Sequence, residues 1–264
     1  MTTNGMPIST QSTLNSSAML PTQVIMSVVI VFCNATGQKG TGWLVSGQHI
    51  VTNEHVVRGG APTNVVVQFS DGTVHQVTKI TCDALTDLAV LDLAAAVAYS
   101  PLKIEAKPLD IADKVYAWGH PLGYSGPPPI LTVGYLAGFN PHLIQGMTSP
   151  QLRLVLNAAL NPGNSGGPIF KWGELAVRGV AVTKHAPITP YLQSAIAALK
   201  NNNSGVVFTA TNPQGGTSNF VESQVVAEIL QYFRDMTQVV IGEAITANDL
   251  IVFLNKNQIP WTAA

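Results

Sequence analysis

Charged side chains are scarce in this chain: 10% of its 264 residues are Asp, Glu, Lys or Arg, where about 25% is usual. The formal net charge is −1, so the chain lacks the excess of cations that neutralises phosphate groups. We therefore expect neither nucleic acid nor an acidic membrane surface as a partner. Hydrophobic residues make up 46% of the chain, which together with the small net charge excludes a disordered protein.

Long hydrophobic runs and a cysteine framework are also missing. The longest apolar stretch near the N-terminus, 24–32, is interrupted by Ser27 and is far shorter than the roughly 20 residues of a membrane helix. No basic residue precedes Lys39, so no secretory signal is indicated and a cytoplasmic location is favoured. Two cysteines, Cys33 and Cys82, are too few for a disulfide framework, and we expect both to be free, buried thiols.

Short β-rich runs separated by Gly, Pro, Asn and Asp fill the first 210 residues and predict an all-β barrel or sandwich. The runs fall into two sets of six, and Ser-Asp-Gly at 70–72 predicts a hairpin turn within the first set. The first set comprises 24–32, 42–46, 49–53, 64–69, 73–79 and 88–93. The second set comprises 113–118, 130–139, 151–157, 167–170, 175–182 and 205–211.

The chain divides at a segment with Pro101, Pro108 and no clean period, which is typical of a connection between sub-barrels. We expect a flexible lead at 1–20, an N-terminal barrel at 21–97, a connection at 98–112, a C-terminal barrel at 113–212 and a helical extension at 213–264.

Helices are predicted late in the chain. Capping boxes formed by Asn219 with Glu222 and by Thr246 with Asp249 precede the apolar patterns 225–233 and 250–254. A further helix is predicted at 191–200, where it interrupts the second set of strands.

The segment 161–170, NPGNSGGPIF, places three glycines and two prolines around one serine and predicts a tight loop that can approach a ligand closely. This composition fits either a glycine-rich hairpin with an incidental serine or a loop that carries a nucleophile, Ser165. In the second case the backbone N–H groups of Gly163 and Ser165 can point at the oxygen of an attacked carbonyl. Each such donor stabilises the transition state by about 3 to 4 kcal/mol.

A serine hydroxyl becomes a good nucleophile only beside a base, and a third group must hold that base in the right tautomer. His55 follows the β-rich run 49–53, so we expect a strand to hold its ring at a barrel edge. Asp87 precedes the apolar run 88–93, where we expect a partly buried carboxylate. Taken singly, each fits a structural role. The chain order His, Asp, Ser with a glycine loop is, however, one of the few orders known for the catalytic triad.

The strings GTGWLVSGQHIVTNEHVV, TDLAVLDL and NPGNSGGPIF resemble the trypsin-like serine peptidases of the chymotrypsin fold, and in particular their HtrA (Deg) branch. The resemblance covers roughly residues 24–212. It implies two six-stranded antiparallel barrels with the site in the cleft between them. It also implies that His55 is the general base, Asp87 its orienting partner and Ser165 the nucleophile, with Gly163 and Ser165 as the oxyanion hole.

The same resemblance bears on specificity. In this family the residue six before the nucleophile sets the floor of the specificity pocket, which here is Ala159, and the walls come from Gly179, Ala181 and Val182. None of these residues is acidic, so a basic substrate side chain would be desolvated without a partner. We expect cleavage after small or medium aliphatic residues.

The chain also departs from the family. HtrA proteases usually carry a PDZ domain after the protease, whereas only about 50 residues follow the last predicted barrel strand, so none is expected here. We expect the helix at 225–233 to pack on the barrels. The insertion at 185–205 lies beside the expected cleft, and it or the C-terminal helices could dock an activating partner. His120 stands where HtrA-like sequences have Asn, and we expect it to cap a loop.

Together these features predict a serine endopeptidase that acts on polypeptides. No cofactor and no metal site are expected, because no HExxH motif or spaced Cys and His set occurs. Two alternatives remain open: a non-catalytic protease-fold module that binds peptides, and a protease that is latent until a partner activates it.

Overall fold

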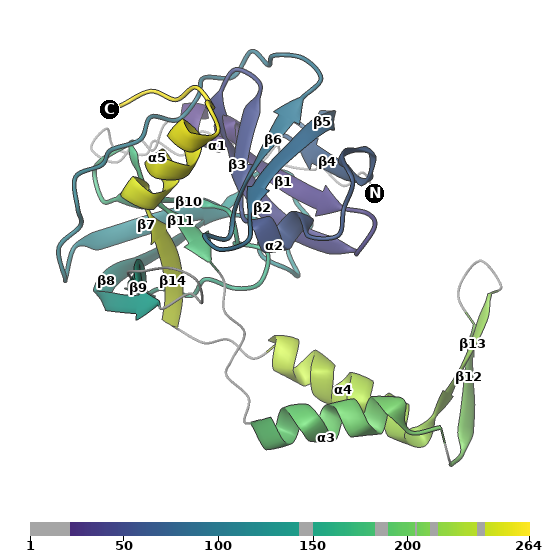
Figure 1. Cartoon of the computed structure of the whole chain (residues 1–264). Helices are drawn as coiled ribbons and strands as arrows, with labels where there is room; N and C mark the ends of the chain where they lie inside the picture. The colour runs from purple at the N-terminus through teal and green to yellow at the C-terminus, as the bar shows by residue number, and fades with distance from the viewer. Residues whose placement is uncertain (1–21, 143–149, 183–189, 204, 212–215, 237–240) are drawn as a thin grey trace, which may run out of the picture.

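The computed structural model describes residues 22–142, 150–182, 190–203, 205–211, 216–236 and 241–264, so the expected flexible lead lies outside the described residues. Two closed barrels of six strands each make up most of the described chain (Figure 1). Every neighbouring pair of strands in both barrels is antiparallel. The predicted all-β class and the two-barrel architecture are therefore confirmed.

The first barrel is built from six strands that follow one another in the chain, in the spatial order β1-β2-β3-β6-β5-β4. They are β1 (Val28–Cys33), β2 (Gln38–Ser46), β3 (His49–Thr52), β4 (Val65–Gln68), β5 (Val74–Asp83) and β6 (Leu88–Leu93). A short helix, α2 (Glu54–Val57), and a 3₁₀ turn, η1 (Pro62–Asn64), separate β3 from β4. The predicted turn at 70–72 joins β4 to β5, and Gly72 has a φ of +87° there, which glycine adopts without strain.

The second barrel has the spatial order β10-β11-β14-β9-β8-β7. Its strands are β7 (Lys114–Gly119), β8 (Ile130–His142), β9 (Gln151–Asn157), β10 (Pro168–Lys171), β11 (Val177–Val182) and β14 (Ile241–Thr246). Five of the six predicted barrel strands are therefore confirmed. The sixth, predicted at 205–211, forms a strand, β12 (Val207–Thr211), but its predicted place in the barrel is wrong.

The closing strand of the second barrel is β14, which lies between β11 and β9. Ala244 and Ile245 of β14 are fully buried, whereas every residue of β12 (Val207–Thr211) is exposed. Only β14 can thus shield apolar surface between two neighbours. The second barrel consequently extends beyond the expected range of 113–212 and takes a strand from the expected helical extension.

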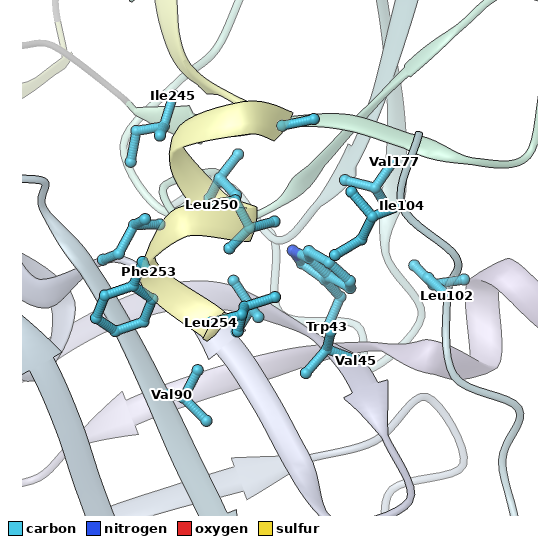
Figure 2. Close-up of a cluster of buried hydrophobic side chains, with 14 of the residues drawn as sticks. Trp43, Val45, Val90, Leu102, Ile104, Val177, Ile245, Leu250, Phe253 and Leu254 are labelled. Carbon is cyan, nitrogen blue, oxygen red and sulfur yellow. The ribbon is translucent and has the colours of Figure 1, made fainter. Parts of the chain in front are cut away.

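One hydrophobic cluster joins the two barrels, and helix α5 (Ala247–Lys256) packs into it. Figure 2 shows Leu250 and Leu254 of α5 on the side that faces Trp43 of the first barrel and Phe253 on the other side of the helix. All four side chains are at most 2% exposed. Fully burying a side chain of this size stabilises the fold by about 1.5 to 3 kcal/mol, so α5 fastens the barrels to each other.

The predicted cap of α5 is confirmed. Thr246 Oγ1 accepts a hydrogen bond from the Asp249 N–H at 3.1 Å and donates to Asp249 Oδ2 at 2.7 Å. This satisfies one of the amide groups that a helix leaves open at its N-terminus. The cap fixes the point at which β14 turns into α5.

The segment between β11 and β14 forms neither barrel. It contains α3 (Pro190–Asn201), the ribbon of β12 and β13 (Thr217–Val221), and α4 (Glu222–Met236). We call residues 190–236 the inserted segment, and it extends to one side of the barrels (Figure 1). The helix predicted at 191–200 is confirmed as α3.

Helix α4 does not pack as predicted. Ala227 is fully buried, but five apolar side chains of the helix are exposed, from 42% for Val226 to 63% for Phe233. The predicted cap of α4 is also wrong, because Asn219 lies in β13 and its Oδ1 accepts a hydrogen bond from Thr209 Oγ1. Instead, Gln224 Oε1 accepts from the Val221 N–H at 3.1 Å.

Two local predictions for the first barrel need correction. The run at 24–32 begins as a helix, α1 (Thr22–Ser27), before β1 starts at Val28. Val24 of α1 is buried in the cluster between the barrels. An apolar residue is needed at this position whether the segment is a helix or a strand, so the apolar run did not distinguish the two. Both cysteines are free, but Cys33 is buried and Cys82 is exposed. No helix among the described residues has the length and apolar composition to span a membrane.

Candidate active site

His55 and Asp87 form a hydrogen-bonded pair at one end of the first barrel. The His55 Nδ1 atom lies 2.9 Å from Asp87 Oδ2 and 3.0 Å from Oδ1. The His55 backbone N–H also donates to Oδ1, at 3.0 Å. A carboxylate beside Nδ1 favours the tautomer that carries its proton there, which leaves Nε2 free to accept a proton. His55 lies in α2 and not on a strand, which corrects the expected position of the ring.

The turn that carries Asp87 is held from several directions. Asp87 has a φ of +59°, a left-handed conformation that costs a non-glycine residue about 1 to 2 kcal/mol. Its carbonyl oxygen accepts hydrogen bonds from Asn53 Nδ2 at 2.9 Å and from the Glu54 N–H at 3.2 Å. These bonds and those to His55 offset the strain and fix the carboxylate, whose side chain is 18% exposed.

Arg153 reaches this turn from the second barrel. It lies on β9, is 5% exposed, and donates from Nη2 to the Thr86 carbonyl oxygen at 3.1 Å. Burial lowers the pKa of the Arg153 guanidinium, and the negative charges of Asp87, Glu243 and Asp249 oppose that shift. Because Thr86 immediately precedes Asp87, Arg153 connects the second barrel to the backbone that positions the carboxylate.

Thr41 of β2 fastens the loop that carries Ser165. The Thr41 N–H donates to the Ser165 carbonyl oxygen at 2.8 Å, and Thr41 Oγ1 donates to the Gly163 carbonyl oxygen at 2.6 Å. Thr41 Oγ1 also accepts from the His120 N–H at 2.9 Å. One residue of the first barrel thus fixes the serine loop of the second.

Gly163 and Gly166 are required by the shape of this loop. Both have positive φ angles, +95° and +87°. A Cβ on Gly163 would lie 2.5 Å from the His120 carbonyl oxygen, and one on Gly166 would lie 2.1 Å from that of Thr41. No other residue type fits at either position without displacing the backbone.

The amide groups of the loop are used unequally. The N–H groups of Asn164, Gly166 and Gly167 donate to backbone carbonyl oxygens. Within the part of the chain that the structure describes, the N–H of Gly163 has no acceptor. Gly163 also lines a cavity between the barrels, so this donor is available to a ligand there.

His55, Gly163 and Ser165 line one cavity of about 540 Å³ between the barrels. The His55 side chain is 30% exposed, whereas Ser165 is 4% exposed. Gln231 of the inserted segment lines the same cavity. A base, a hydroxyl and an open amide donor therefore line one cavity, and these are the kinds of group that acyl transfer uses. The full set of lining residues is Thr36, Gly37, Gln38, Lys39, His55, Val56, Leu122, Pro162, Gly163, Ser165, Val182 and Gln231.

Of the four residues predicted for specificity, one lines this cavity and three do not. Val182 lines it, and Ala159 lies half-buried on the segment that leads to Ser165. Gly179 and Ala181 lie on β11, and the Ala181 methyl group packs in the core of the second barrel. The backbone of Ala181 exchanges hydrogen bonds with Gly166 and Gly167, so β11 runs directly beside the serine loop.

His120 is buried below the loop. Its Nε2 lies 2.9 Å from the Pro127 carbonyl oxygen, a contact that ties together the turn after β7. Burial lowers the pKa of His120 to about 4, the hydrogen bond to Pro127 opposes that shift, and the charge of Lys39 adds to it. The ring is neutral at pH 7 and serves the loop, in line with the expected structural role.

Thr41, Lys39 and Arg153 were not singled out by the motifs. The sequence pattern around Arg153 could have indicated its role. Gln151 and Arg153 are polar residues at alternating positions of a largely apolar strand, and both are buried. Among the described residues, no group of three or more His, Cys, Asp and Glu side chains is arranged to hold a metal ion.

Comparison with known proteins gives consistent results. Residues 40–180 match the family described as “Trypsin-like peptidase domain”. “Protease Do-like 1, chloroplastic” of Arabidopsis thaliana is 34% identical over 137 residues, which are 50% of this chain and 30% of that protein. “Serine endoprotease DegS” of Escherichia coli K12 is 34% identical over 131 residues, or 48% of this chain and 35% of that protein. The matched region thus spans about a third of the length of these relatives.

The similarity to solved structures covers more of this chain than the similarity to the sequence relatives does. The active form of the Rv3671c protease from M. tuberculosis superimposes with a TM-score of 0.58 at 20% identity, over 91% of this chain and 85% of that one. The HtrA-type protease AlgW, solved with a tripeptide, gives a TM-score of 0.58 at 18% identity, over 90% and 61% of the two chains. These similarities concern the two-barrel fold.

Proposed function

The chain belongs to the trypsin-like peptidase family, and on this premise we propose that it is a serine endopeptidase with Ser165 as nucleophile, His55 as general base and Asp87 as the group that orients His55. The observation that carries the proposal is the cavity shared by His55 and Ser165, with Asp87 on the far side of the imidazole. Three motifs that lie far apart in the sequence meet at this point.

The first half of the reaction forms an acyl-enzyme. Ser165 Oγ attacks the carbonyl carbon of the peptide bond, and its proton moves to His55 Nε2. The imidazolium is stabilised by Asp87, whose carboxylate already accepts from Nδ1. The C–N bond then breaks, and His55 returns the proton to the leaving amine. The acyl group remains bound to Ser165 as an ester.

The second half hydrolyses this ester. Water enters the space vacated by the amine, His55 removes one of its protons, and the oxygen attacks the acyl carbon. The C–O bond to Ser165 breaks, and His55 gives the proton back to the serine oxygen. Every proton is accounted for within the site, so the cycle restores the starting state.

Gly163 and Ser165 supply the oxyanion hole of this proposal. Negative charge develops on the carbonyl oxygen in each tetrahedral intermediate, and backbone N–H groups stabilise it without reorganising. Support comes from the open N–H of Gly163, which lines the cavity. The bonds from Thr41 to both residues keep the donors aligned.

For the acyl side of the substrate we propose small or medium aliphatic residues such as Ala, Val and Leu. Val182 lines the cavity, Ala159 leaves the neighbouring segment uncharged, and none of the described lining residues is Asp or Glu. Peptides with Val or Ala before the cleaved bond should be hydrolysed faster than matched peptides with Arg or Lys. The reverse order would overturn this part of the proposal.

A fluorophosphonate probe tests the nucleophile directly. The wild-type protein should be labelled at Ser165, and the Ser165→Ala variant should not be labelled. Ser100 is exposed, and the Ser100→Ala variant serves as a matched control that should still be labelled. Asp87→Asn should lower the rate of peptide hydrolysis by about 10⁴-fold, because it reverses the tautomer of His55. Labelling of Ser165→Ala to the wild-type extent would exclude Ser165 as the nucleophile.

A partner-activated protease is the second candidate, and the inserted segment favours it. Gln231 of α4 lines the cavity beside His55, so a partner that holds the inserted segment can change access to Ser165. Labelling that starts only after a partner is added would support this candidate. Labelling of the isolated chain at full rate would exclude it. A site that is never labelled would instead favour a non-catalytic binding module.

A further inference from the structure

A single lysine lies in the cavity that holds Ser165. Lys39, on β2, is half-buried there, and its Nζ donates to the Tyr124 carbonyl oxygen at 2.8 Å. Among the described residues, no carboxylate lies within ion-pair distance of Nζ. Burial lowers the pKa of Lys39. The cation is therefore partly desolvated and has only a neutral hydrogen-bond partner.

The contacts of β2 place Lys39 relative to Ser165. Gly40, the next residue, packs so closely that a Cβ there would lie 3.2 Å from the Ser165 carbonyl oxygen and 2.6 Å from Val56. Val56 follows His55 in α2. Lys39 thus belongs to the wall that the first barrel contributes beside His55, whereas Val182 belongs to the wall contributed by the second barrel.

The proposed mechanism indicates which part of the substrate, before or after the cleaved bond, lies near Lys39. In the proposed mechanism the acyl group stays with Ser165 and its side chain points toward Val182. The leaving amine takes its proton from His55, so the chain beyond the cleaved bond runs along the first barrel. Lys39 and the preceding residues Thr36, Gly37 and Gln38 form the cavity wall on that side.

We propose that Lys39 selects substrates with Asp or Glu within the first three residues after the cleaved bond. This proposal rests on the proposed peptidase function and adds a substrate class to it. A carboxylate offers Lys39 the charged partner that the protein itself does not provide, and a charge-assisted hydrogen bond is stronger than the bond to the Tyr124 carbonyl oxygen. Salt should weaken the preference, because it screens partly exposed charges.

The test compares internally quenched peptides that are identical up to Val before the cleaved bond. Glu or Gln is placed at each of the three following positions in turn. All peptides are amidated at the C-terminus and continue well beyond these positions, so that a terminal carboxylate cannot substitute for the side chain. A separate peptide with Gln and a free α-carboxylate close to the cleaved bond reports on that alternative source.

For the wild-type protein we expect kcat/KM to be about three- to tenfold higher for Glu than for Gln at one of these positions, the range of a partly exposed ion pair. Lys39→Met should abolish the preference, Lys39→Glu should reverse it, and Lys39→Arg should keep it. The exposed Lys79 of β5 provides the control, because Lys79→Met removes the same charge away from the cavity and should keep the preference.

Equal kcat/KM values for Glu and Gln at all three positions in the wild-type protein would overturn the proposal, as would a Glu preference that survives in Lys39→Met. A preference for the free α-carboxylate alone would also reject the side-chain assignment. The fluorophosphonate probe separates this failure from failure of the peptidase function. Labelling of Ser165 with cleavage but without a Glu preference rejects only the role of Lys39, whereas a protein that neither reacts nor cleaves rejects both.

Discussion

Helices α4 and α5 have similar amphipathic sequences but opposite environments. In α5, Leu250 and Leu254 are fully buried between the barrels, whereas in α4 Ile229 and Leu230 are 48% and 42% exposed. Helix α5 follows directly after β14, a strand of the barrel, and Thr246 caps it at that junction. Its apolar side is therefore carried onto the cluster that joins the two barrels.

The barrels and the inserted segment consequently serve different purposes. The barrels with α5 contain the buried core and the residues proposed for catalysis, and they include both strands that flank the insertion. Because β11 and β14 are paired with each other, Val182 opposite Glu243, the barrel closes without residues 190–236. The inserted segment adds Gln231 to the cavity but little to the core, which separates stability from access to the site.

The largest expected effect is a difference in stability between alanine variants of two leucines, one in α5 and one in α4. Leu254→Ala should lower the free energy of unfolding by about 2 to 5 kcal/mol, because it leaves a cavity in a core that both barrels share. Leu230→Ala should change it by about 0.5 kcal/mol or less, because the side chain is already exposed. Urea unfolding of the two variants measures both values. Equal losses would show that α4 is as well packed in solution as α5.

Protonation of His120 should contribute the next largest effect. Its folded-state pKa of about 4 lies below the usual value of 6.5, so the unfolded chain binds a proton between these pH values while the folded chain does not. Stability from this residue is complete above pH 6.5 and falls as the pH drops toward 4, by at most about 1.4 kcal/mol per pH unit.

His120→Gln should remove this part of the pH dependence, since the amide can still donate to Pro127. The exposed His142 serves as control, and His142→Gln should keep it. Urea midpoints at pH 7 and pH 5 test the difference. Because His120 follows β7 of the second barrel and not the inserted segment, deleting that segment should leave the dependence of stability on pH unchanged. A dependence that survives in His120→Gln would have to be assigned to another group.

Arg153 should have a smaller and more specific effect. We expect Arg153→Met to reduce kcat/KM for a Val peptide about tenfold, or about 1.4 kcal/mol, because the turn before Asp87 loses its hydrogen bond from the second barrel. Arg153→Lys should recover part of the loss. The pH profile of kcat/KM should shift in Arg153→Met, since the cation lies in the field of Asp87. A loss of stability with an unchanged profile would make Arg153 purely structural.

The smallest effect is expected for removal of the inserted segment. Residues 184–239 can be replaced by a Gly/Ser turn of about four residues, the usual length for joining antiparallel neighbours. The rate at which the fluorophosphonate probe labels Ser165 should change by less than about threefold, which corresponds to under about 1 kcal/mol in activation free energy. A truncated protein that unfolds, or one that reacts much faster, would refute the separation of stability from access or reveal that the segment restrains the site.

The sequence was most informative where local chemistry is specific. The glycines around Ser165 were predictable because the loop needs positive φ angles and close backbone approach at Gly163 and Gly166. Asp87 was predictable because a carboxylate before a buried strand sits at its edge. The strand at 205–211 was misassigned for the opposite reason: its apolar residues favour a strand, but nothing in them says which neighbour it pairs with.

The sequence by itself determined the strands of the first barrel, five of the six strands of the second barrel and the serine loop, because strand alternation, turn residues and short motifs act over a few residues. The pairing of Asp87 with His55 joins residues far apart in the chain and was expected from the resemblance to the peptidase family. Only the tertiary structure decided that β14 closes the second barrel, that α5 and not α4 fills the core, and that Thr41, Lys39 and Arg153 reach the site. These contacts join residues far apart in the chain. They depend on which surfaces bury the most apolar area together, a property of the whole fold that no local segment carries.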